Sequence, residues 1–404
     1  MKALRKIEAH ILNEFVASSP YNHYKKTSNW AVLETNKKNT CHYLGYFVDE
    51  VLKGTALLIQ TKTLFGSYLY IPLGPCVDYL DQELTKDFLN ELIRYAKECH
   101  AFFLRMDPNV IRVSRDILGN QTPEINQEYI STYLKDLGFR HKGYGYAYNG
   151  SWSNRYTLAI DISKDRNEII SNFNKSKQNV LKRHDRIGVT TRKGNEEDLS
   201  VLMAFEQELS LTQKFKPHSK TYFLQYLQDF KDYAHLYITE LHTDTLIHAI
   251  EEEIQSGKYK KDKEALQAKE RELQEARKWK EQYGSIIPLA AGLFLHYGTK
   301  SWDLYTYSGK EFNNMKPTDH LHLYAITDLK SHGVTFYDMC GFSGVVDKKD
   351  RYYGLYDYKK SFGSQFIEYI GEFDYIIQAL PFKLYLFSYK VKLRLQYYWK
   401  RITT

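Results

Sequence analysis

Two adjacent lysines, Lys359 and Lys360, stand in an aromatic stretch near the end of the chain, residues 354–363, which reads as a turn. Residues 336–340 before it have the composition of a β-strand, and the loop Gly341-Phe342-Ser343-Gly344 follows that strand. Glycine lets a backbone approach a ligand closely, and a partly enclosed ammonium can stabilise a developing oxyanion. The stretch therefore suggests a group-transfer site, although solvated lysines beside a core of aromatic residues would explain the same pattern.

The remaining elements must position this stretch, and hydrophobic periodicity predicts a mixed α/β order in two rounds. In residues 1–150 the expected strands are 41–48, 54–61, 68–71 and 101–106, and the expected helices are 6–18, 82–98 and 125–137. A similar order recurs with strands 156–160, 188–192, 234–241 and 286–297 and helices 169–184, 196–210 and 221–230. Two αβ units of similar order indicate a duplicated domain.

A highly charged segment, residues 247–282, interrupts the second round. Leu266, Leu273 and Ala276 form one thin apolar seam, and the other faces pair Glu with Lys or Arg at helical spacing. Ser256-Gly257 is the natural break between two helices. The pattern predicts a helical hairpin arm inserted in the second domain, and a solvated surface helix or a disordered insert would also account for it.

The last 28 residues, 377–404, place lysines and arginines among leucine, tyrosine, phenylalanine and tryptophan. This is the pattern of a basic amphipathic helix that can lie on an anionic bilayer. Helices of this kind also pack on their own protein, so both readings stay open.

Composition narrows the class of protein. The net charge of +7 and pI near 8.8 favour polyanionic partners, and 35 tyrosines suit a protein that presents hydroxyl-bearing aromatic surfaces to polar ligands. The four cysteines, Cys41, Cys76, Cys99 and Cys340, have no spacing for a zinc site or a disulfide framework. No signal peptide or transmembrane run is evident, so we expect a cytoplasmic protein.

Motifs for covalent catalysis are missing from the sequence: we find no GxSxG elbow, Walker A loop, HExxH or GxGxxG in a strand–helix context. The phosphate loop of acetyl-CoA-dependent acyltransferases is also absent. A basic helix, residues 175–184, presents Lys175 and Lys182, together with Lys177 and Arg183, towards one broad face that could hold phosphates. A solvated helix is the alternative.

Several short segments, taken together and in order, resemble the FemABX family over nearly the whole chain. The matching segments are 70–79 (YIPLGPCVDY), 103–108 (FLRMDP), 137–143 (LGFRHKG), 176–179 (SKQN) with 188–189 (GV), 288–291 (PLAA), 354–359 (GLYDYK) and 368–373 (EYIGEF). The resemblance implies an aminoacyl-tRNA-dependent peptidyltransferase that builds peptidoglycan interpeptide bridges. The resemblance also implies that this enzyme needs no cofactor or metal and that the transferred amino acid is alanine, serine or glycine.

The same resemblance implies an α/β fold of two tandem GNAT-like domains. We assign residues 1–154 to the first domain, 155–243 with 284–376 to the second, 244–283 to the arm and 377–404 to the C-terminal helix. The arm favours the lineage that acts on the lipid-linked precursor, lipid II, at the inner face of the membrane. The thin apolar seam of the arm fits an intramolecular hairpin, so we expect a monomer.

By the family match, Lys359 is the oxyanion donor, Tyr358 stacks beside it, and Asp107 accepts the proton of the attacking amine. The 2′-hydroxyl of the tRNA or the leaving oxygen could shuttle that proton instead, and a carboxylate before proline is often a turn cap. The acceptor is expected in a groove of the first domain, and the residues expected near it are Trp30, Asp78, Asp107 and Tyr305.

Two positions depart from relatives that use a soluble precursor: Val32 replaces a lysine, and His218 replaces an arginine. Lys220 or the basic helix could supply the pyrophosphate contacts instead. Two other functions stay open: a divergent GNAT acyltransferase with another activated donor, and a catalytically silent tRNA-binding or scaffold paralogue.

Overall fold

A computed structural model describes residues 1–146 and 152–402. The chain forms two compact units, unit 1 (Met1–Thr157, Gly341–Tyr356 and Phe366–Thr404) and unit 2 (Leu158–Cys340 and Asp357–Gln365). The sequence-based division placed all of 284–376 in the second domain, whereas part of that stretch returns to unit 1. The returning parts are residues 341–356 and 366–376, and within the second of them β16 (Phe373–Ile376) pairs with β5 (Ala101–Met106) of unit 1.

Unit 1 contains a seven-stranded sheet in the order β1-β2-β3-β4-β5-β16-β8. Its other strands are β1 (Lys2–Lys6), β2 (Thr40–Val48), β3 (Val51–Thr63), β4 (Gly66–Ile71) and β8 (Arg140–His141), and β6 (Val113–Arg115) pairs with β7 (Gln121–Asn126) apart from it. The first four strands run antiparallel, and β4 and β5 run parallel. Every residue of β5 is buried, which explains its uninterrupted apolar sequence around Arg105.

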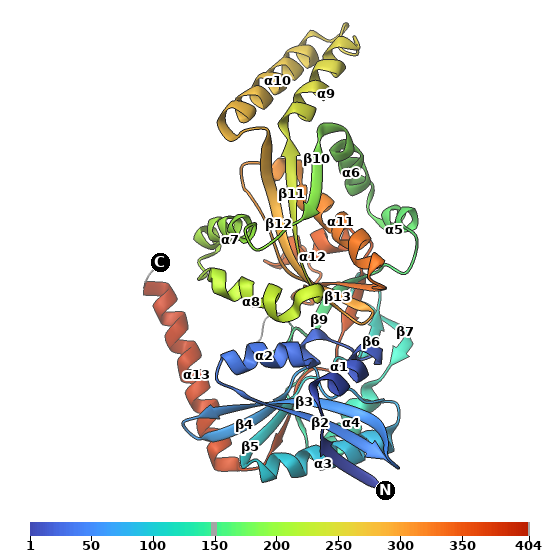
Figure 1. Cartoon of the computed structure of the whole chain (residues 1–404), viewed down its shortest axis with the longest axis vertical. Coiled ribbons are helices and arrows are strands. Elements are labelled where there is room, and N and C mark those ends of the chain that lie inside the picture. Colours follow the sequence, from blue (N-terminus) through green and yellow to red (C-terminus); the bar gives the residue numbers. More distant parts are fainter. Residues whose placement is uncertain (147–151, 403–404) are drawn as a thin grey trace. The chain divides into compact units, whose positions relative to one another are not determined.

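The helices of unit 1 are α1 (Ala9–Ser18), α2 (Ser28–Asn36), α3 (Gln82–Glu98), α4 (Glu128–Asp136) and α13 (Ala379–Ile402), with the short η1 (Tyr24–Lys26). Helix α3 begins at Asp81, whose carboxylate accepts the N–H of Leu84 at 3.0 Å. Its apolar residues recur at helical spacing and pack, with Phe88 and Leu92 fully buried, into the core of the sheet. Helix α13 packs against β5 (Figure 1).

Unit 2 contains the second sheet, in the order β10-β11-β12-β13-β14-β9-β15. Its strands are β9 (Tyr156–Asp161), β10 (Val189–Lys193), β11 (Ala234–His242), β12 (Ile286–Tyr297), β13 (Lys300–Ser308), β14 (Phe336–Gly341) and β15 (Gln365–Glu368). Again the first four strands of the order run antiparallel and the next pair, β13 and β14, runs parallel. The first five strands of the two sheets therefore follow one order with the same directions, whereas the last two positions are filled differently.

The helices of unit 2 are α5 (Arg166–Asn172), α6 (Lys175–Ile187), α7 (Leu199–Gln213), α8 (Lys220–Phe230), α9 (Thr243–Gln255), α10 (Lys263–Tyr283) and α11 (Pro317–Ser331), with η2 (Lys231–Tyr233) and η3 (Asn313–Met315). Helices α9 and α10 pair with each other and project beyond the ends of β11 and β12 (Figure 1). The base of this pair packs through Ile247 and Trp279 on a core cluster of unit 2. Among the described helices, none has the length and hydropathy needed to span a membrane.

Two local expectations differ from the structure. The stretch expected as a turn at 354–363 is largely helical, as α12 (Tyr353–Lys360). The expected helix 169–184 is divided at Phe173 and Asn174, because the Asn174 side chain accepts the N–H of Lys177 and starts α6 anew.

Candidate active site

Asp107, the residue that follows β5, has the chemistry expected of a proton acceptor in unit 1. Its carboxylate accepts hydrogen bonds from the Tyr70 hydroxyl, at 3.0 Å to each oxygen, and from the Leu73 N–H at 2.8 Å. Burial raises the pKa of Asp107 to about 6, and Glu372 adds in the same direction. A carboxyl group that titrates this close to neutral pH can accept a proton during a reaction.

The loop after β4 holds Asp107 in place through a glycine. Gly74 has φ +71°, and a Cβ there would lie 2.9 Å from the Pro108 Cα and 2.5 Å from the Tyr79 hydroxyl. This close approach lets Asn109 donate its N–H to the Leu73 carbonyl at 3.1 Å while the Leu73 N–H reaches Asp107. The YIPLGP segment thus acts locally as the support of the carboxylate.

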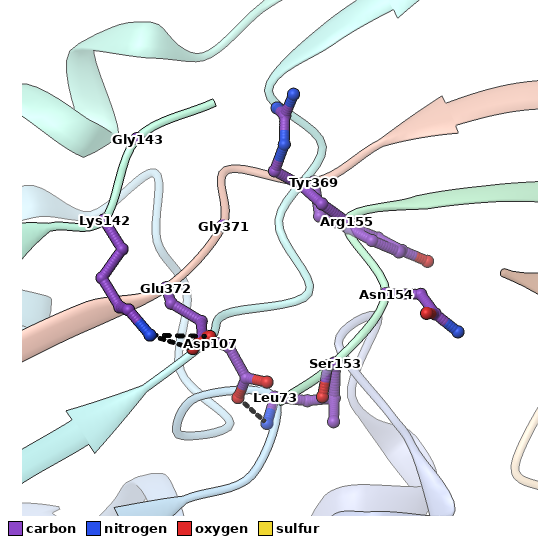
Figure 2. Close-up of a pocket in the computed structure, with 10 residues that line it drawn as sticks. All are labelled: Leu73, Asp107, Lys142, Gly143, Ser153, Asn154, Arg155, Tyr369, Gly371 and Glu372. Atoms are coloured by element: carbon purple, nitrogen blue, oxygen red, sulfur yellow. Dashed lines mark hydrogen bonds and ion pairs between the residues drawn. The ribbon is translucent and has the colours of Figure 1, made fainter. Parts of the chain in front are cut away.

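A small pocket of about 80 Å³ surrounds the Asp107 carboxylate (Figure 2). Lys142 and Glu372 form an ion pair on its wall, with 3.2 Å between Nζ and Oε2. The Glu372 carboxylate also accepts the Trp152 N–H at 3.0 Å, and the guanidinium of Arg155 pairs with Glu368. The pocket is therefore lined by groups of both charges, which suits a polar ligand that carries an amine.

A larger pocket of about 400 Å³ is lined in part by Tyr70, the tyrosine that bonds Asp107. Its lining residues are Lys25, Trp30, Glu34, Asn39, Ile59, Thr61, Tyr68, Tyr70 and Trp152. Because Tyr70 lines this pocket and bonds Asp107, which lines the smaller one, a single side chain connects the two. Four aromatic residues and the polar side chains between them form a surface for a ligand with both apolar and polar parts.

Trp30 owes its place in this pocket to the start of α2. The Thr27 hydroxyl caps the helix by accepting the Trp30 N–H at 3.3 Å. The ammonium groups of Lys25 and Lys37 lie 5.5 and 5.3 Å from the centre of the indole ring, within the range of a cation–π interaction.

Lys26 is a candidate that the sequence-based reading missed. It lies on η1, is 2% exposed, and donates from Nζ to the Asn109 Oδ1 at 2.8 Å. Burial lowers the pKa of Lys26, while Cys76 and Asp107 oppose that shift. The sequence shows a lysine beside aromatic residues, and nothing in the local pattern distinguishes Lys26 from the neighbouring Lys25.

Asp78, expected near the acceptor, lines neither pocket among the described residues. Its side chain is exposed and accepts the Leu80 N–H at 3.0 Å, so it caps the turn that leads into α3. Its expected role in substrate binding stays a prediction.

In unit 2, Lys359 is a buried ammonium on the last turn of α12. It is 6% exposed, and Nζ donates to the Cys340 carbonyl at 2.9 Å. Burial lowers the pKa of Lys359, whereas Cys340, Asp303 and Asp338 oppose the shift. Cys340 has φ +62°, and its N–H donates to the Asp338 Oδ1 at 2.7 Å. The end of β14 is therefore folded so that a backbone carbonyl faces the lysine.

A second carboxyl group with a raised pKa accompanies Lys359. Burial raises the pKa of Asp303 to about 6, and the carboxylate accepts the Thr306 hydroxyl at 2.6 Å. His322 lies 4.0 Å from Asp303 and bonds the Tyr337 hydroxyl at 2.6 Å through Nδ1. Sequence reasoning missed these partners because they come from β13, β14 and α11.

Tyr358 contacts a different lysine from the one expected. Its ring centre is 4.2 Å from the ammonium of Lys177, and its ring lies near His322 and Phe362. Lys177 in turn forms a buried ion pair with Asp319, with 2.5 Å between Nζ and Oδ1. The expectation that Lys177 shares a phosphate-binding face with Lys175 is therefore wrong, because its side chain points into the core of unit 2.

The other basic residues of α6 are on its surface. Lys175, Lys182 and Arg183 are exposed, and Arg183 lies 3.7 Å from Glu272 of α10. These three positions fall on one face of the helix, whereas Lys177 falls on the opposite face. Their proposed contact with phosphates stays a prediction.

The structure brings together two residues that the sequence reading named separately, His218 and Tyr305. Their rings are 5.3 Å apart, and the Tyr305 hydroxyl is 2.6 Å from that of Tyr222. The fully buried Glu206 holds His218, with 2.5 Å to Nδ1 and 3.0 Å to the backbone N–H. Lys220 lies exposed at the start of α8, and Trp30, Asp78 and Asp107 belong to the other unit.

The glycine loop 341–344 serves packing within unit 1. A Cβ on Gly344, which has φ +77°, would lie 2.4 Å from the Tyr156 ring, and one on Gly341 would lie 2.1 Å from the Asn154 side chain. These glycines therefore let the backbone approach the side chains of Tyr156 and Asn154, which are part of the protein and not of a ligand.

Comparison with known proteins gives a match over nearly the whole chain. The model of the FemAB family matches residues 7–390. Aminoacyltransferase FemA of Staphylococcus aureus, from strains bovine RF122 / ET3-1 and N315, is 24% identical over 409 residues, covering 94% of this chain and 97% of FemA. The crystal structure of FemX superposes with a TM-score of 0.80 at 22% identity, over 95% of this chain and 99% of FemX. The expected α/β fold with two GNAT-like domains is thus confirmed.

Proposed function

The chain belongs to the FemAB family and is an aminoacyltransferase, and from this premise we propose that it builds peptidoglycan cross-bridges. In this proposal the donor is an aminoacyl-tRNA that carries alanine, serine or glycine. The acceptor is the amino group of the stem-peptide lysine, or of a growing bridge, on lipid II. The proposal places the reaction on the cytoplasmic side of the membrane.

The buried ammonium of Lys359 is the observation that carries the proposal. An ester of an amino acid with the tRNA ribose is already activated, so the transfer needs orientation and stabilisation of negative charge more than a protein nucleophile. Lys359 is held at 2.9 Å from an uncharged carbonyl, in surroundings that exclude most water. A positive donor in such surroundings interacts strongly with a developing oxyanion.

The proposed reaction has two bond changes. The acceptor nitrogen attacks the ester carbon, which forms the new C–N bond and a tetrahedral oxyanion that Lys359 stabilises. Collapse of this intermediate breaks the C–O bond to the ribose, and the ribose oxygen takes up one proton from solvent and leaves as a hydroxyl, which balances the proton that the nitrogen gives up. The nitrogen loses one proton, for which the ionised carboxylate of Asp107 is the acceptor, supported by its pKa of about 6.

The pockets of unit 1 support a role in acceptor binding. The indole of Trp30, flanked by two lysine ammonium groups, can pack against the apolar parts of a peptide or sugar while the lysines face phosphate oxygens. Glu372 and Asp107 lie in the adjoining pocket, where an acceptor amine would find two carboxylates.

Helix α13 supports contact with the lipid surface that holds such a precursor. Phe382 and Tyr385 pack on Phe102 and Phe103 of β5. A row of large apolar side chains lies exposed elsewhere on the helix: Leu380, Leu384, Phe387, Val391 and Leu395. Their spacing of four, three, four and four residues is that of a single helix face, and Lys383 and Lys390 are exposed beside it. An apolar row flanked by lysines suits an anionic bilayer.

Acceptor-dependent discharge of the tRNA tests the proposed reaction. The chain would be incubated with tRNA charged with alanine, serine or glycine, with and without lysine-containing lipid II in detergent. We expect the ester to be lost only when the acceptor is present. Consumption of an acyl-CoA thioester in place of the tRNA ester would instead identify a divergent acyltransferase, and tRNA binding without discharge would identify a silent paralogue.

Liposome flotation tests the proposed role of α13. The double variant Leu384→Glu, Phe387→Glu removes the centre of the exposed row and should lose binding to liposomes that contain anionic lipid. Its turnover on a soluble acceptor analogue should stay within a few-fold of the unchanged chain. The matched variant Leu64→Glu changes an exposed leucine of unit 1 outside the helix and should float as before. Equal binding by both variants would contradict the assignment.

A further inference from the structure

Three histidines and an aspartate gather at one end of the unit 2 sheet, apart from the residues discussed so far. His235 lies on β11, His296 lies on β12, Asp328 lies on α11, and His332 is the residue that caps the end of α11. The ring centres of His235 and His332 are 5.0 Å apart, and those of His296 and His332 are 5.1 Å apart. No step of the proposed transfer uses these side chains.

The geometry of three of these residues is that of a ligand set. His235, Asp328 and His332 each offer one nitrogen or oxygen atom, and the three atoms lie within 4.8 Å of one another. A metal ion bound at about 2.0–2.2 Å from each ligand needs donor atoms no farther apart than about 4.4 Å, so small side-chain movements would close the set. Two imidazoles and one carboxylate suit zinc and its neighbours in the first transition row.

Hydrogen bonds already orient two of the three ligands, His235 and Asp328. The His235 Nε2 and His296 Nδ1 are 2.7 Å apart, so one proton is shared between these rings. The Asp328 Oδ2 accepts the Tyr237 hydroxyl at 2.8 Å. Ligands of metal sites are commonly fixed by such outer hydrogen bonds, which hold the ring and the carboxylate in the binding orientation.

Lys193 now supplies the positive charge at this carboxylate. Its Nζ lies 2.8 Å from the Asp328 Oδ1, and its side chain is 55% exposed. A lysine that is largely in solvent can leave the carboxylate at little cost, since an exposed ion pair contributes little to stability. A divalent ion would take the place of the ammonium, so the lysine and the metal compete for Asp328.

We propose that His235, Asp328 and His332 form a binding site for a divalent transition-metal ion such as Zn²⁺, with His296 and Tyr237 as supporting residues. The site joins β11 to the end of α11, so the bound ion would stabilise unit 2. It lies at the end of the sheet where β14 begins, as His332 precedes Phe336 in the chain, whereas Cys340 and Lys359 lie at the other end of that strand. Four residues of strand span about 13 Å. The ion therefore has a structural role and takes no part in the transfer.

Metal titration of the full chain tests the site. Protein without a histidine tag would be stripped with EDTA, dialysed and titrated with Zn²⁺ by calorimetry, and with Co²⁺ by absorption spectroscopy. We expect one equivalent to bind, the d–d bands of Co²⁺ to show nitrogen and oxygen ligands, and the melting temperature to rise by several degrees, because binding to the folded state stabilises it.

Variants separate this site from chance binding by surface histidines. His332 is partly exposed, so His332→Ala should fold normally and bind the ion at least ten-fold more weakly. Lys193→Gln should bind more tightly, because it removes the competing ammonium. His248→Ala, at an exposed histidine of α9, should bind like the unchanged chain. A chain that binds no equivalent, or an affinity unchanged in both His332→Ala and Lys193→Gln, would overturn the proposal.

Discussion

Strand β5 of unit 1 and strand β14 of unit 2 are each the fifth strand of a sheet, and the first five strands of the two sheets run in the same directions, yet different chemical groups stand at their ends. After β5 comes a carboxylate, Asp107, that lines a pocket and accepts hydrogen bonds from Tyr70 and Leu73. At the end of β14 the backbone carbonyl of Cys340 takes the hydrogen bond of Lys359. The same five-strand order thus carries a carboxylate after its fifth strand in one unit and a carbonyl bound by a lysine in the other.

Each unit also buries a lysine, and the partners of the two lysines differ. Lys26 donates to the side-chain amide of Asn109 at 2.8 Å, which ties η1 to the segment after Asp107. Lys359 donates to a main-chain carbonyl whose own residue has a strained, positive φ. We infer that Lys26 supports its site, whereas Lys359 acts on a substrate, and the Lys359 variant below tests the second assignment.

Removal of Lys359 should have the largest effect. Lys359→Ala is expected to lower turnover by roughly 10²–10³-fold, the scale of losing one oxyanion donor, while the affinity for charged tRNA stays near that of the unchanged chain. Single-turnover transfer and filter binding measure the two quantities. The adjacent Lys360→Ala is the matched control and should stay within a few-fold. Equal turnover in the two variants would remove Lys359 from catalysis.

Asp107→Asn should lower turnover by roughly 10²-fold, the lower range for loss of a general base. The base must be ionised to act, so kcat/KM of the unchanged chain should fall as the pH drops below about 6, the pKa of Asp107. The Asp107→Asn variant should lose this pH dependence. Because Asp303, whose pKa is also about 6, is still present in the variant, that loss would assign the dependence to Asp107. A variant profile that keeps the acid limb would assign that limb to Asp303 or to the substrate.

The same substitution should change stability in the opposite sense. The folded-state pKa of Asp107 lies above its unfolded value of about 3.9, so the ionised form destabilises the fold above pH 6 and the penalty fades as the pH falls towards 4. Asp107→Asn keeps an acceptor for the Leu73 N–H. We therefore expect its melting temperature to exceed that of the unchanged chain at pH 7.5 and to approach it at pH 4.

Trp30→Ala should act mainly on acceptor binding. Loss of a half-buried aromatic wall of the larger pocket is expected to raise KM for the acceptor about ten-fold with little change in kcat, since Trp30 lines the larger pocket whereas Asp107 lines the smaller one. Trp30→Phe should recover most of the affinity. A fall in kcat at unchanged KM would contradict the assignment of this pocket to the acceptor.

The basic face of α6 should affect the binding of tRNA. Lys182→Gln with Arg183→Gln is expected to weaken tRNA binding by about ten-fold at moderate salt and to reduce the salt dependence by about one contact for each charge. Lys97→Gln, an exposed lysine of α3, serves as the control. If the tRNA affinity of the double variant depended on salt as strongly as that of the unchanged chain, this face would not bind the phosphates of the tRNA.

Elements with strong local patterns were predictable from the sequence. Helix α3 spans Gln82–Glu98 as expected, because its apolar period and its aspartate cap agree, and β12 spans Ile286–Tyr297 because a long apolar run can be buried on both faces. The helix α12 was read as a turn, since the stretch 354–363 holds two glycines and three aromatic residues and the helix is only 8 residues long.

Candidate site residues could be named from the sequence where a local motif contains them. They could not be named where burial depends on a hydrogen-bond partner far away in the chain. Asp107 and Lys359 could be named from their motifs. Lys26 could not, because its partner Asn109 is 83 residues away, and Lys177 was misplaced because its partner Asp319 is 142 residues away. The burial of such a lysine depends on a partner that only the folded chain brings near, so it cannot be predicted from the local sequence.

Mass spectrometry of the precursor tests the central claim most directly. Lysine-containing lipid II would be incubated with the chain and a pool of charged tRNAs, and then analysed for added mass. We expect the mass of one small amino acid, joined through an amide, and no such product with Lys359→Ala under the same conditions. Unmodified lipid II, with the acceptor intact and the tRNA still charged, would contradict the proposed transfer.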